Sequence, residues 1–525
     1  MMLLDHIRLR VRRGIAGAIA LAVALALSTA AVTASGAAVT SKKAKVDKSA
    51  VLRVGVPLND QGGVFFDPSN SVLNPFARLW VDLIYDTMIH DTPDGKGAPG
   101  LATKWSTPDP QTVELTLRNA KFSDGSAFNS AAVKAAWERL LASSVTTIPS
   151  EIKAITSIET PDDHTVRVHL SEPLSKQWIN ETLRNSFWLG VPSPAAVQAG
   201  NVTTKPVGAG PYALDNYQEG QQVTLKRNPQ FYDPRAQKLG GIEFIEVSTG
   251  APALAALQGG TVDLIGNLAT DALDKIKGQP GLALSSQPGT LVYDISLCTS
   301  EGPFASKKAR QALQYAIDRK GINDAAFAGQ GTPTILPLSP SHPFYNKALA
   351  KTYSYNPKKA KALFKQAGVK PGTTITALVP TGPPEPAISE IVQSELKDLG
   401  LKVQITPSTN VPADAVRLRP AMDFVGMDPT LFQFAFAPPV ANALNACGWK
   451  NADVEAALNA TKNASLSEGQ VKAAWDKFQK LVLAESPVVF TDVAPLLAAH
   501  TDKVKGIDII YNIIGPYLRD VYMVK

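Results

Sequence analysis

A change in the rhythm of apolar residues near residue 300 constrains the fold of this chain more than any other feature. Before it, short alternating segments such as Val51–Val56 and Thr165–Leu170 are separated by turns rich in Pro and Asp, which is typical of strands. One helix is expected there, from Ser130 to about Ala142. After it, helices such as Ser306–Ile322 and Ser467–Ala484 alternate with strands. The pattern predicts a strand-rich first lobe and an α/β second lobe.

The last part of the chain returns to strand character, at residues 488–490, 504–510 and 518–524. We expect these terminal strands to rejoin the first lobe. A chain that crosses twice between two lobes has a hinge and an interlobe cleft, which is a favoured place for a ligand. At 525 residues, the chain is long enough for two large lobes.

Local signals fix several helix ends. Asn356 followed by Pro357 predicts a helix start, and Gly368 predicts its end. Gly400 ends a further helix, directly before the strand Leu401–Ile405.

The N-terminus has the three parts of a secretory signal peptide. Basic residues at 8–13 precede the apolar run Gly14–Leu27, and small residues follow through Ala38. Val32-Thr33-Ala34 is a suitable cleavage site, which predicts a mature chain that begins near residues 31–39.

An uncleaved membrane anchor is the alternative to a cleaved signal. No charged residue lies between Arg13 and Lys42, so the segment is long enough to span a bilayer. Its second half is rich in Ala, Ser, Thr and Gly, which makes it a poor lipid-facing helix. No cysteine lies near the cleavage zone, so we do not expect a lipoprotein.

The net charge of +6 comes from the first 48 residues, which carry eight basic and two acidic side chains. The rest of the chain is neutral, so it has no net attraction for phosphates and no nucleic-acid partner is expected. The basic residues at 42–48 indicate a solvated linker between signal and body.

Motifs for catalysis are absent or lack their context. Gly95–Gly100 matches G-x-G-x-x-G, but it follows a turn instead of a strand, so we interpret it as a hairpin loop and not a dinucleotide site. Two S-x-x-K matches, at Ser150–Lys153 and Ser394–Lys397, lack the companion motifs of an acyl-serine enzyme. The sequence contains no P-loop, no G-x-S-x-G and no H-E-x-x-H.

Histidines and cysteines do not form a metal motif. The five histidines beyond the signal are scattered, at His90, His164, His169, His342 and His500. Cys298 and Cys447 form an even pair in an exported chain, which favours a disulfide that closes on the second lobe, with two separate buried thiols as the alternative.

Several ordered segments resemble the family 5 extracellular solute-binding proteins of ABC importers, which include dipeptide-, oligopeptide- and nickel-binding members. Individually these matches are weak, but their order is that of the family and they extend over about residues 51–525. They are Leu83–Ile89 with Pro99–Trp105, Lys121–Gly125, Lys205–Tyr212 with Lys226–Tyr232, Gly260–Asp263 and Ala309–Arg319.

The resemblance implies an α/β, bilobed fold of the type II periplasmic-binding-protein kind, with an extra subdomain in the first lobe. After a signal peptide at 1–36 and a basic linker at 37–50, it implies lobe I at 51–295 and 491–525. The inserted subdomain is expected at about 90–204, and lobe II at 296–490.

The implied function is capture of a small solute, with a short peptide expected, and its delivery to an ABC permease and ATPase complex. The resemblance implies an exported monomer, periplasmic or at the cell-envelope exterior, without catalysis and without a cofactor or metal. Two alternatives stay open: an exported cell-envelope hydrolase, and a family-like regulator of envelope polymer assembly without transport. The sequence does not name the solute.

From lobe I, we expect Asn74 and Phe76 to contact the ligand, because they lie in the turn-rich loop after the first strand, and Gly208 in a Gly-Ala-Gly-Pro loop. A buried polar ligand needs convergent hydrogen bonds and aromatic walls, since an unpaired polar group costs about 1–3 kcal/mol. Ordinary loop packing is the alternative for each of these residues.

From lobe II, we expect Met427, Asp428 and Phe434 to contact the ligand. Family members often carry a Trp here and an Asp that holds the amino terminus of a peptide. This stretch is short and has no Trp, which puts peptide specificity in question. Asp428 is either the acidic anchor or the turn residue before Pro429.

Overall fold

The computed structural model describes residues 45–59, 63–70, 75–145, 148–185, 187–266, 268, 270–427, 429, 432–437, 444–445, 447–511 and 515–525. The chain divides into two units, 1–44 and 45–525. The predicted signal peptide lies outside the described residues. All that follows concerns the second unit.

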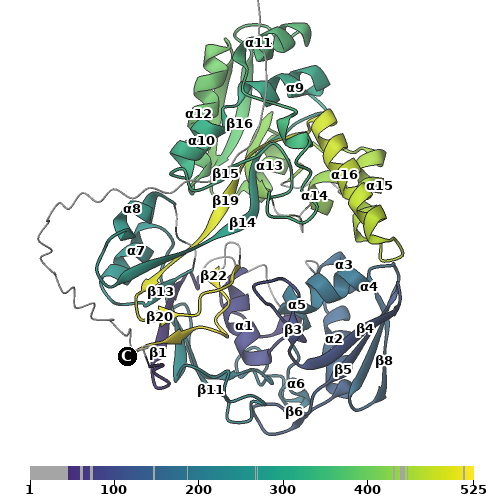
Figure 1. Ribbon diagram of the computed structural model, residues 1–525, viewed down its shortest axis with the longest axis vertical. Helices are drawn as coiled ribbons and strands as arrows, with labels where there is room; N and C mark the ends of the chain where they lie inside the picture. The colour runs from purple at the N-terminus through teal and green to yellow at the C-terminus, as the bar shows by residue number, and fades with distance from the viewer. Residues whose placement is uncertain are drawn as a thin grey trace, which may run out of the picture. The chain divides into compact units, whose positions relative to one another are not determined.

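One mixed sheet of eleven strands extends through the whole body (Figure 1). β1 (Val51–Val56) is buried and pairs in parallel with a strand on each side, β12 (Gly241–Glu246) and β13 (Leu264–Ile265). The order is β10 (Tyr212–Gln218), β11 (Gln222–Arg227), β12, β1, β13, β19 (Val488–Thr501), β14 (Leu282–Leu297), β18 (Met422–Met427), β16 (Thr374–Pro380) and β17 (Lys402–Ser408), with β15 (Thr332–Pro333) on β19.

The two longest strands, β14 and β19, run antiparallel through the middle of this sheet and connect its two ends (Figure 1). Their pairing is interrupted between Pro288 and Val292. A side chain at Gly289, inside the interruption, would collide with the carbonyl oxygen of Ala494. We call the part on the β10–β13 side lobe I and the part on the β16–β18 side lobe II.

Lobe I contains a second, four-stranded antiparallel sheet. We call this sheet and the helices that cover it the subdomain. Its core packs Trp137 and Trp178 against strand residues such as Leu115 and Val166. The sheet order is β4 (Ala102–Asp109), β5 (Thr112–Leu117), β9 (Thr165–Leu170) and β8 (Ile155–Asp162), covered by α2 (Ser130–Leu141), α3 (Ser150–Lys153), α4 (Ser175–Gln177), a π-helical turn (Trp178–Thr182), α5 (Leu183–Asn185) and α6 (Pro194–Gln198).

The rest of lobe I has its own core around β1 and α1 (Arg78–Tyr85). α7 (Ala251–Gln258) and α8 (Leu273–Ile276) pack on β13 and β19. Short strand pairs complete it: β2 (Ile89–His90) with β3 (Ala98–Pro99), β6 (Ala120–Lys121) with β7 (Ala127–Phe128), β20 (Val504–Lys505) with β23 (Tyr522–Met523), and β21 (Ile510–Tyr511) with β22 (Gly515–Pro516).

Lobe II is built from helices on its part of the sheet. α11 begins where Asn356 accepts a hydrogen bond from the backbone N–H of Lys359, as predicted, and α16 begins with a capping box between Ser467 and Gln470. The helices are α9 (Lys307–Ala316), α10 (Arg319–Ala326), α11 (Pro357–Gln366), α12 (Glu385–Asp398), α13 (Val411–Leu418), α14 (Phe432–Phe436), α15 (Ala452–Lys462) and α16 (Glu468–Glu485).

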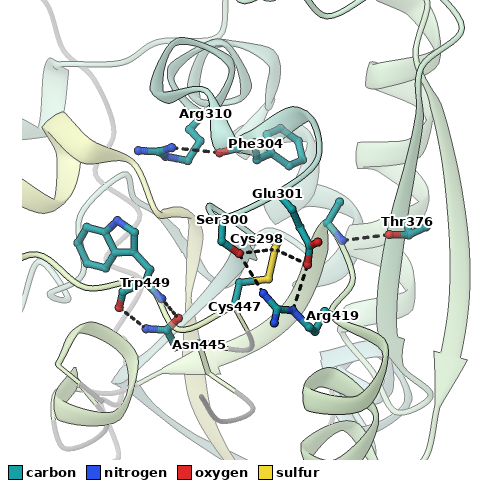
Figure 2. Close-up of a disulfide and its surroundings, with 11 residues drawn as sticks. Cys298, Ser300, Glu301, Phe304, Arg310, Thr376, Arg419, Asn445, Cys447 and Trp449 are labelled. Carbon is teal, nitrogen blue, oxygen red and sulfur yellow. Dashed lines mark hydrogen bonds and ion pairs between the residues drawn. A yellow bond between two sulfur atoms is a disulfide. The ribbon is translucent and has the colours of Figure 1, made fainter. Parts of the chain in front are cut away.

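A disulfide joins Cys298, directly after β14, to Cys447, with 5.2 Å between the Cα atoms (Figure 2). It closes a loop of 149 residues inside lobe II. The predicted pairing is therefore present in the structure.

Three expectations about secondary structure need correction. The helix expected over 306–322 is two helices, because the Asp318 side chain accepts a hydrogen bond from the N–H of Lys320 and starts α10. The strands expected over 504–510 and 518–524 contain only two-residue strands. α1 was not expected, although Arg78 and Asp82 lie four residues apart on one face of it and its other residues are apolar.

The two ends of the described body meet. Val46 forms a bridge with Val524, and the N–H of Asp47 donates to the carbonyl of Met523. In the described part of the chain, no helix has the length and apolar character needed to cross a membrane.

Candidate functional site

The carboxyl end of β18 lies beside the crossing strands. Met427, its last residue, pairs with Val292, the first residue of β14 beyond the interruption. The predicted ligand segment of lobe II thus begins where β14 passes from one lobe to the other. On the lobe I side, the Gln287 side chain accepts from the N–H of Ile510 and donates to the carbonyl of Asp508, which fixes the C-terminal segment to β14.

The six predicted ligand residues have different environments. Phe434 on α14 is 53% exposed, whereas Phe76 is 9% exposed and belongs to the core of lobe I. The backbone of Met427 is in β18. Asn74 and Asp428 lie outside the described residues. The structure does not bring the described members into a common contact, so their role in binding stays a prediction.

Gly208 has a packing role. An added Cβ would collide with the carbonyl oxygen of Ile84 in α1, and its own carbonyl accepts a hydrogen bond from the N–H of Ser123. This position joins α1 to the subdomain, so it requires glycine whether or not a ligand contacts it.

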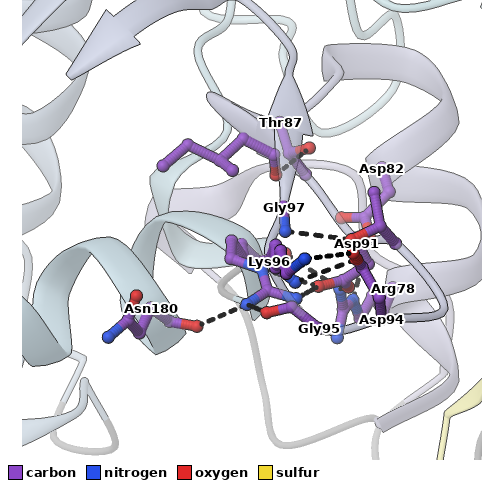
Figure 3. Close-up of polar contacts among 12 residues, drawn as sticks. Arg78, Asp82, Thr87, Asp91, Asp94, Gly95, Lys96, Gly97 and Asn180 are labelled. Atoms are coloured by element: carbon purple, nitrogen blue, oxygen red, sulfur yellow. Dashed lines mark hydrogen bonds and ion pairs between the residues drawn. The ribbon is translucent and has the colours of Figure 1, made fainter.

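A buried ionic network begins on α1 (Figure 3). The Arg78 guanidinium lies 2.9 Å from Asp82 and 2.9 Å from Asp91, and it also donates to the carbonyl of Arg184. Arg184 bonds Asp91 and the carbonyl of Gly95. The Gly95–Gly100 motif is thereby held in the turn of the β2–β3 hairpin, which confirms the hairpin interpretation.

A small cavity of about 10 Å³ lies between α1 and the C-terminal segment, with room for one water molecule. Arg78, Asp82, Tyr517 and Arg519 line it. Burial raises the pKa of Asp82 to about 6, against the opposing effect of Arg78. The charges of Asp86 and Tyr517 outweigh burial and raise the pKa of Arg519. These groups surround the cavity with both signs of charge, and Arg78 and Asp82 are already paired with each other.

Buried carboxylates of a different kind lie near β18: Asp423 is within lobe II, and Asp294 and Asp492 are on the stretches of β14 and β19 that connect the lobes. Asp294, Asp423 and Asp492 are at most 3% exposed, and each has a buried oxygen without a hydrogen-bond donor from the described residues. Burial raises the pKa of Asp423 to about 8 and that of Asp492 to about 8, the latter despite the nearby N–H of Thr332. Asp492 lies opposite Tyr293 on the crossing strands.

One cluster in the described part of the chain has metal-ligand spacing: Cys298, Glu301 and Cys447. The two sulfur atoms are bonded to each other, which removes both as thiolate ligands. The Arg419 guanidinium lies 3.0 Å from Glu301 and takes up its charge (Figure 2).

The sequence interpretation did not select Arg78, Asp82 or Asp492. A signal was present for the first two, since a cation and an anion four residues apart interrupt the otherwise apolar run 78–85. Asp492 lies between Thr491 and Val493 of a strand, and only the assembled sheet shows that its carboxylate is buried.

The bacterial extracellular solute-binding proteins, family 5, match residues 96–433 of this chain, and the chain belongs to that family. Di/tripeptide-binding protein 1 of Pseudomonas aeruginosa (strain UCBPP-PA14) is 27% identical over 376 residues, which cover 65% of this chain and 69% of that protein. Glutathione-binding protein GsiB of Escherichia coli (strain K12) is 29% identical over 304 residues, 56% of this chain and 58% of the relative. The chain thus spans less than two thirds of that relative.

Solved structures share the bilobed fold over nearly the whole body. The substrate-binding protein CtaP of Listeria monocytogenes has a TM-score of 0.78 at 18% identity and covers 91% of this chain and 100% of its own. DppA of Helicobacter pylori, in complex with the peptide STSA, has a TM-score of 0.74 at 22% identity and covers 91% of this chain and 98% of its own. The type II bilobed fold expected from the sequence is confirmed.

Proposed function

We propose that this protein is the exported solute-binding component of an ABC importer, and that it captures short peptides between its lobes for a membrane permease and ATPase complex. The observation that carries the proposal is the pair of strands β14 and β19, which connect the lobes and lose their pairing at Pro288–Val292. Two connections with a local interruption are the parts of a hinge.

The proposed solutes are di- and tripeptides, glutathione among them. Relatives with 27–29% identity carry the names of di/tripeptide- and glutathione-binding proteins. Ligands of this size present an ammonium and a carboxylate, which need charged partners when buried. We assign Asp428 to the ammonium, with Phe434 as an aromatic wall.

The proposed boundaries are 51–295 with 491–525 for lobe I, 90–204 for its subdomain and 296–490 for lobe II. Support comes from separate hydrophobic cores on the two sides of the crossing strands. We propose a monomer without catalytic activity, located outside the cytoplasmic membrane, with 1–36 as a signal peptide and without a lipid anchor.

Isothermal titration calorimetry with glutathione, trialanine and a dipeptide library tests the proposal. We expect at least one peptide to bind the wild type, and Asp428→Ala to weaken its binding about tenfold or more, because a buried ammonium loses its partner. Asp453→Ala is the matched control, since Asp453 is 76% exposed on α15.

Two outcomes would contradict parts of this proposal. Equal affinity of wild type and Asp428→Ala for a peptide would remove Asp428 from the site. Saturable hydrolysis of a peptide by the pure protein would overturn the assignment as a binding protein without catalysis.

A further inference from the structure

The lobes touch each other at a second place, away from the crossing strands. The turn between α15 and α16, which we call the hairpin tip (Lys462–Leu466), meets α3 and α4 of the subdomain (Figure 1). Lys462 Nζ lies 2.8 Å from Glu151 Oε1, and the N–H of Ala464 donates to the carbonyl of Pro173 at 2.6 Å. Lys176 Nζ donates to the carbonyl of Leu466 at 3.2 Å.

The subdomain holds Glu151 in position for this contact. Its Oε2 accepts from the Ser150 hydroxyl at 3.1 Å, and its Oε1 also accepts from Gln177 Nε2 at 3.2 Å. Its carbonyl accepts from the indole N–H of Trp178, a side chain buried in the subdomain core. The carboxylate is therefore oriented by its own lobe before Lys462 arrives.

The hairpin tip is equally well defined. Lys462 is in the last turn of α15, where a cation is favourable, and Ser467 begins α16 with a capping box. Two capped helix ends separated by four residues leave the tip little freedom.

The Glu151–Lys462 pair is mostly withdrawn from water. The two side chains are 19% and 22% exposed. Burial acts to raise the pKa of Glu151, but Lys462 outweighs it, so the pKa is below its usual value. Separation of a partly buried ion pair costs more free energy than separation of an exposed one, because each charge then lacks its oriented partner.

The crossing-strand side of the body has a different contact between lobes: the Thr270 hydroxyl donates to the carbonyl of Ala326 at 2.9 Å. Ala326 ends α10, which bonds the crossing strand β19 through Arg319 and the carbonyl of Phe490. The hairpin tip is instead at the far end of α15 and α16 (Figure 1). A rotation of the lobes about the crossing strands must break the hairpin-tip contacts.

We infer that Glu151 and Lys462 are positioning residues that set ligand affinity without touching the ligand, because they stabilise the closed arrangement of the lobes. The effect on affinity rests on the proposed function, but the effect on lobe closure does not. When only the closed form completes the site, the apparent dissociation constant is the intrinsic one divided by the closed fraction. Loss of the pair therefore weakens binding of every ligand by the same factor.

Small-angle X-ray scattering of the full folded protein without ligand tests the inference. We expect Glu151→Lys and Lys462→Glu each to increase the radius of gyration, and the double variant Glu151→Lys/Lys462→Glu to restore the wild-type value. Lys320→Glu is the matched control. It changes the charge by the same amount as Lys462→Glu, but Lys320 pairs with Asp324 on its own helix and not across the lobes. Circular dichroism checks that each variant is folded.

A second measurement uses trialanine as the probe and reports its dissociation constant. We expect each single variant to raise it about tenfold and the double variant to recover most of the loss. Unchanged scattering in both single variants, or failure of the double variant to restore it, would overturn the inference. If the radius of gyration changes as expected but no peptide binds, the proposed function is contradicted and the inference about lobe closure is not.

Discussion

Buried carboxylates around α1 are paired with charged or aromatic side-chain donors, whereas those near β18 have at most the Ser296 hydroxyl, which donates to Asp294. In lobe I, Asp67 accepts two hydrogen bonds from Arg139, and Asp86 accepts from His90 and Tyr232. In lobe II and on the adjoining stretches of β14 and β19, the described contacts leave buried oxygens of Asp423, Asp294 and Asp492 without donors.

This difference changes the sign of the pKa shifts. Burial acts to raise the pKa of Asp67, but Arg139 and Ser69 outweigh it and leave the pKa below its usual value. In Asp423 nothing opposes burial, and the pKa is about 8. Lobe I therefore gains stability from charged acids, while lobe II retains protons and adds a disulfide. The exception in lobe I is Asp82, with a pKa of about 6, because burial outweighs the effect of Arg78 and the negative charge of Asp91 adds to the rise.

Removal of the disulfide should have the largest effect, confined to lobe II. We expect the double variant Cys298→Ala/Cys447→Ala to lose about 5 kcal/mol of unfolding free energy, because the unfolded chain is freed from a loop of 149 residues. Guanidinium denaturation with tryptophan fluorescence measures it. An unchanged midpoint for the double variant would show that the disulfide contributes nothing to lobe II.

Removal of the central cation of lobe I should follow closely. Arg78→Met removes the cation that pairs with buried Asp82 and one of the two that pair with Asp91, which keeps Arg184, so we expect a loss of about 3–5 kcal/mol in the same denaturation experiment. Arg235→Met is the control, because Arg235 is 92% exposed and pairs only at the surface. Equal losses in the two variants would refute the contrast between buried and exposed pairs.

The pH dependence of the two lobes should be opposite in sign. An acid whose pKa is raised to about 8 in the fold stabilises it below about pH 4, where it is protonated in both states, and this contribution is lost as pH rises toward 8. An acid with a lowered pKa, such as Asp67, stabilises the fold above about pH 4, and this is lost as pH falls. Between pH 5 and pH 8, Asp423 and Asp492 should weaken the fold over the whole range, whereas in lobe I the same loss is confined to Asp82 and ends near pH 6.

Asp423→Asn isolates this effect. We expect it to reduce the loss of stability between pH 5 and pH 8 by about 2 kcal/mol, since one pKa unit corresponds to about 1.4 kcal/mol and a buried site relaxes when it ionises. Differential scanning calorimetry at several pH values measures the change. If the stability of Asp423→Asn falls between pH 5 and pH 8 as steeply as that of the wild type, ionisation of other groups causes the loss.

The smallest effect on stability is expected at Phe434 of α14, in contrast to its neighbour Phe432. Phe434→Ala should change the unfolding free energy by less than about 0.5 kcal/mol, because Phe434 is exposed. Phe432→Ala should cost about 3–5 kcal/mol, since Phe432 is fully buried. If Phe434 is a ligand wall, its substitution weakens peptide binding in calorimetry without this stability loss; unchanged binding would remove it from the site.

Features with local causes could be predicted from the sequence. The start of α11 at Asn356-Pro357 and the start of α16 after Ser467 depend on side chains within three residues. The break between α9 and α10 was missed because apolar spacing continues through it, although the cap that causes it, Asp318, is also local. The change in apolar rhythm predicted the two lobes, and the family resemblance supplied the type II fold that the comparisons confirm.

The site was less predictable, because its groups are far apart in the sequence. Glu151 and Lys462 are separated by 311 positions, and no local pattern links them. Asp423 and Asp294 are ordinary strand residues until the sheet and α14 cover them. A charge in an apolar run indicates burial, but its partner is determined only by tertiary packing.

The return of the chain to lobe I has a consequence for the order of folding during secretion. Val504, Leu518 and Met523 belong to the same core as β1, so the earliest part of the body is completed by the latest. In the proposed export of this chain from its N-terminus, most of lobe II and its disulfide can form before residues 491–525 complete lobe I. β1, the first strand of the body, is then among the last to gain all its core contacts, so lobe I stays incompletely folded until the final segment emerges.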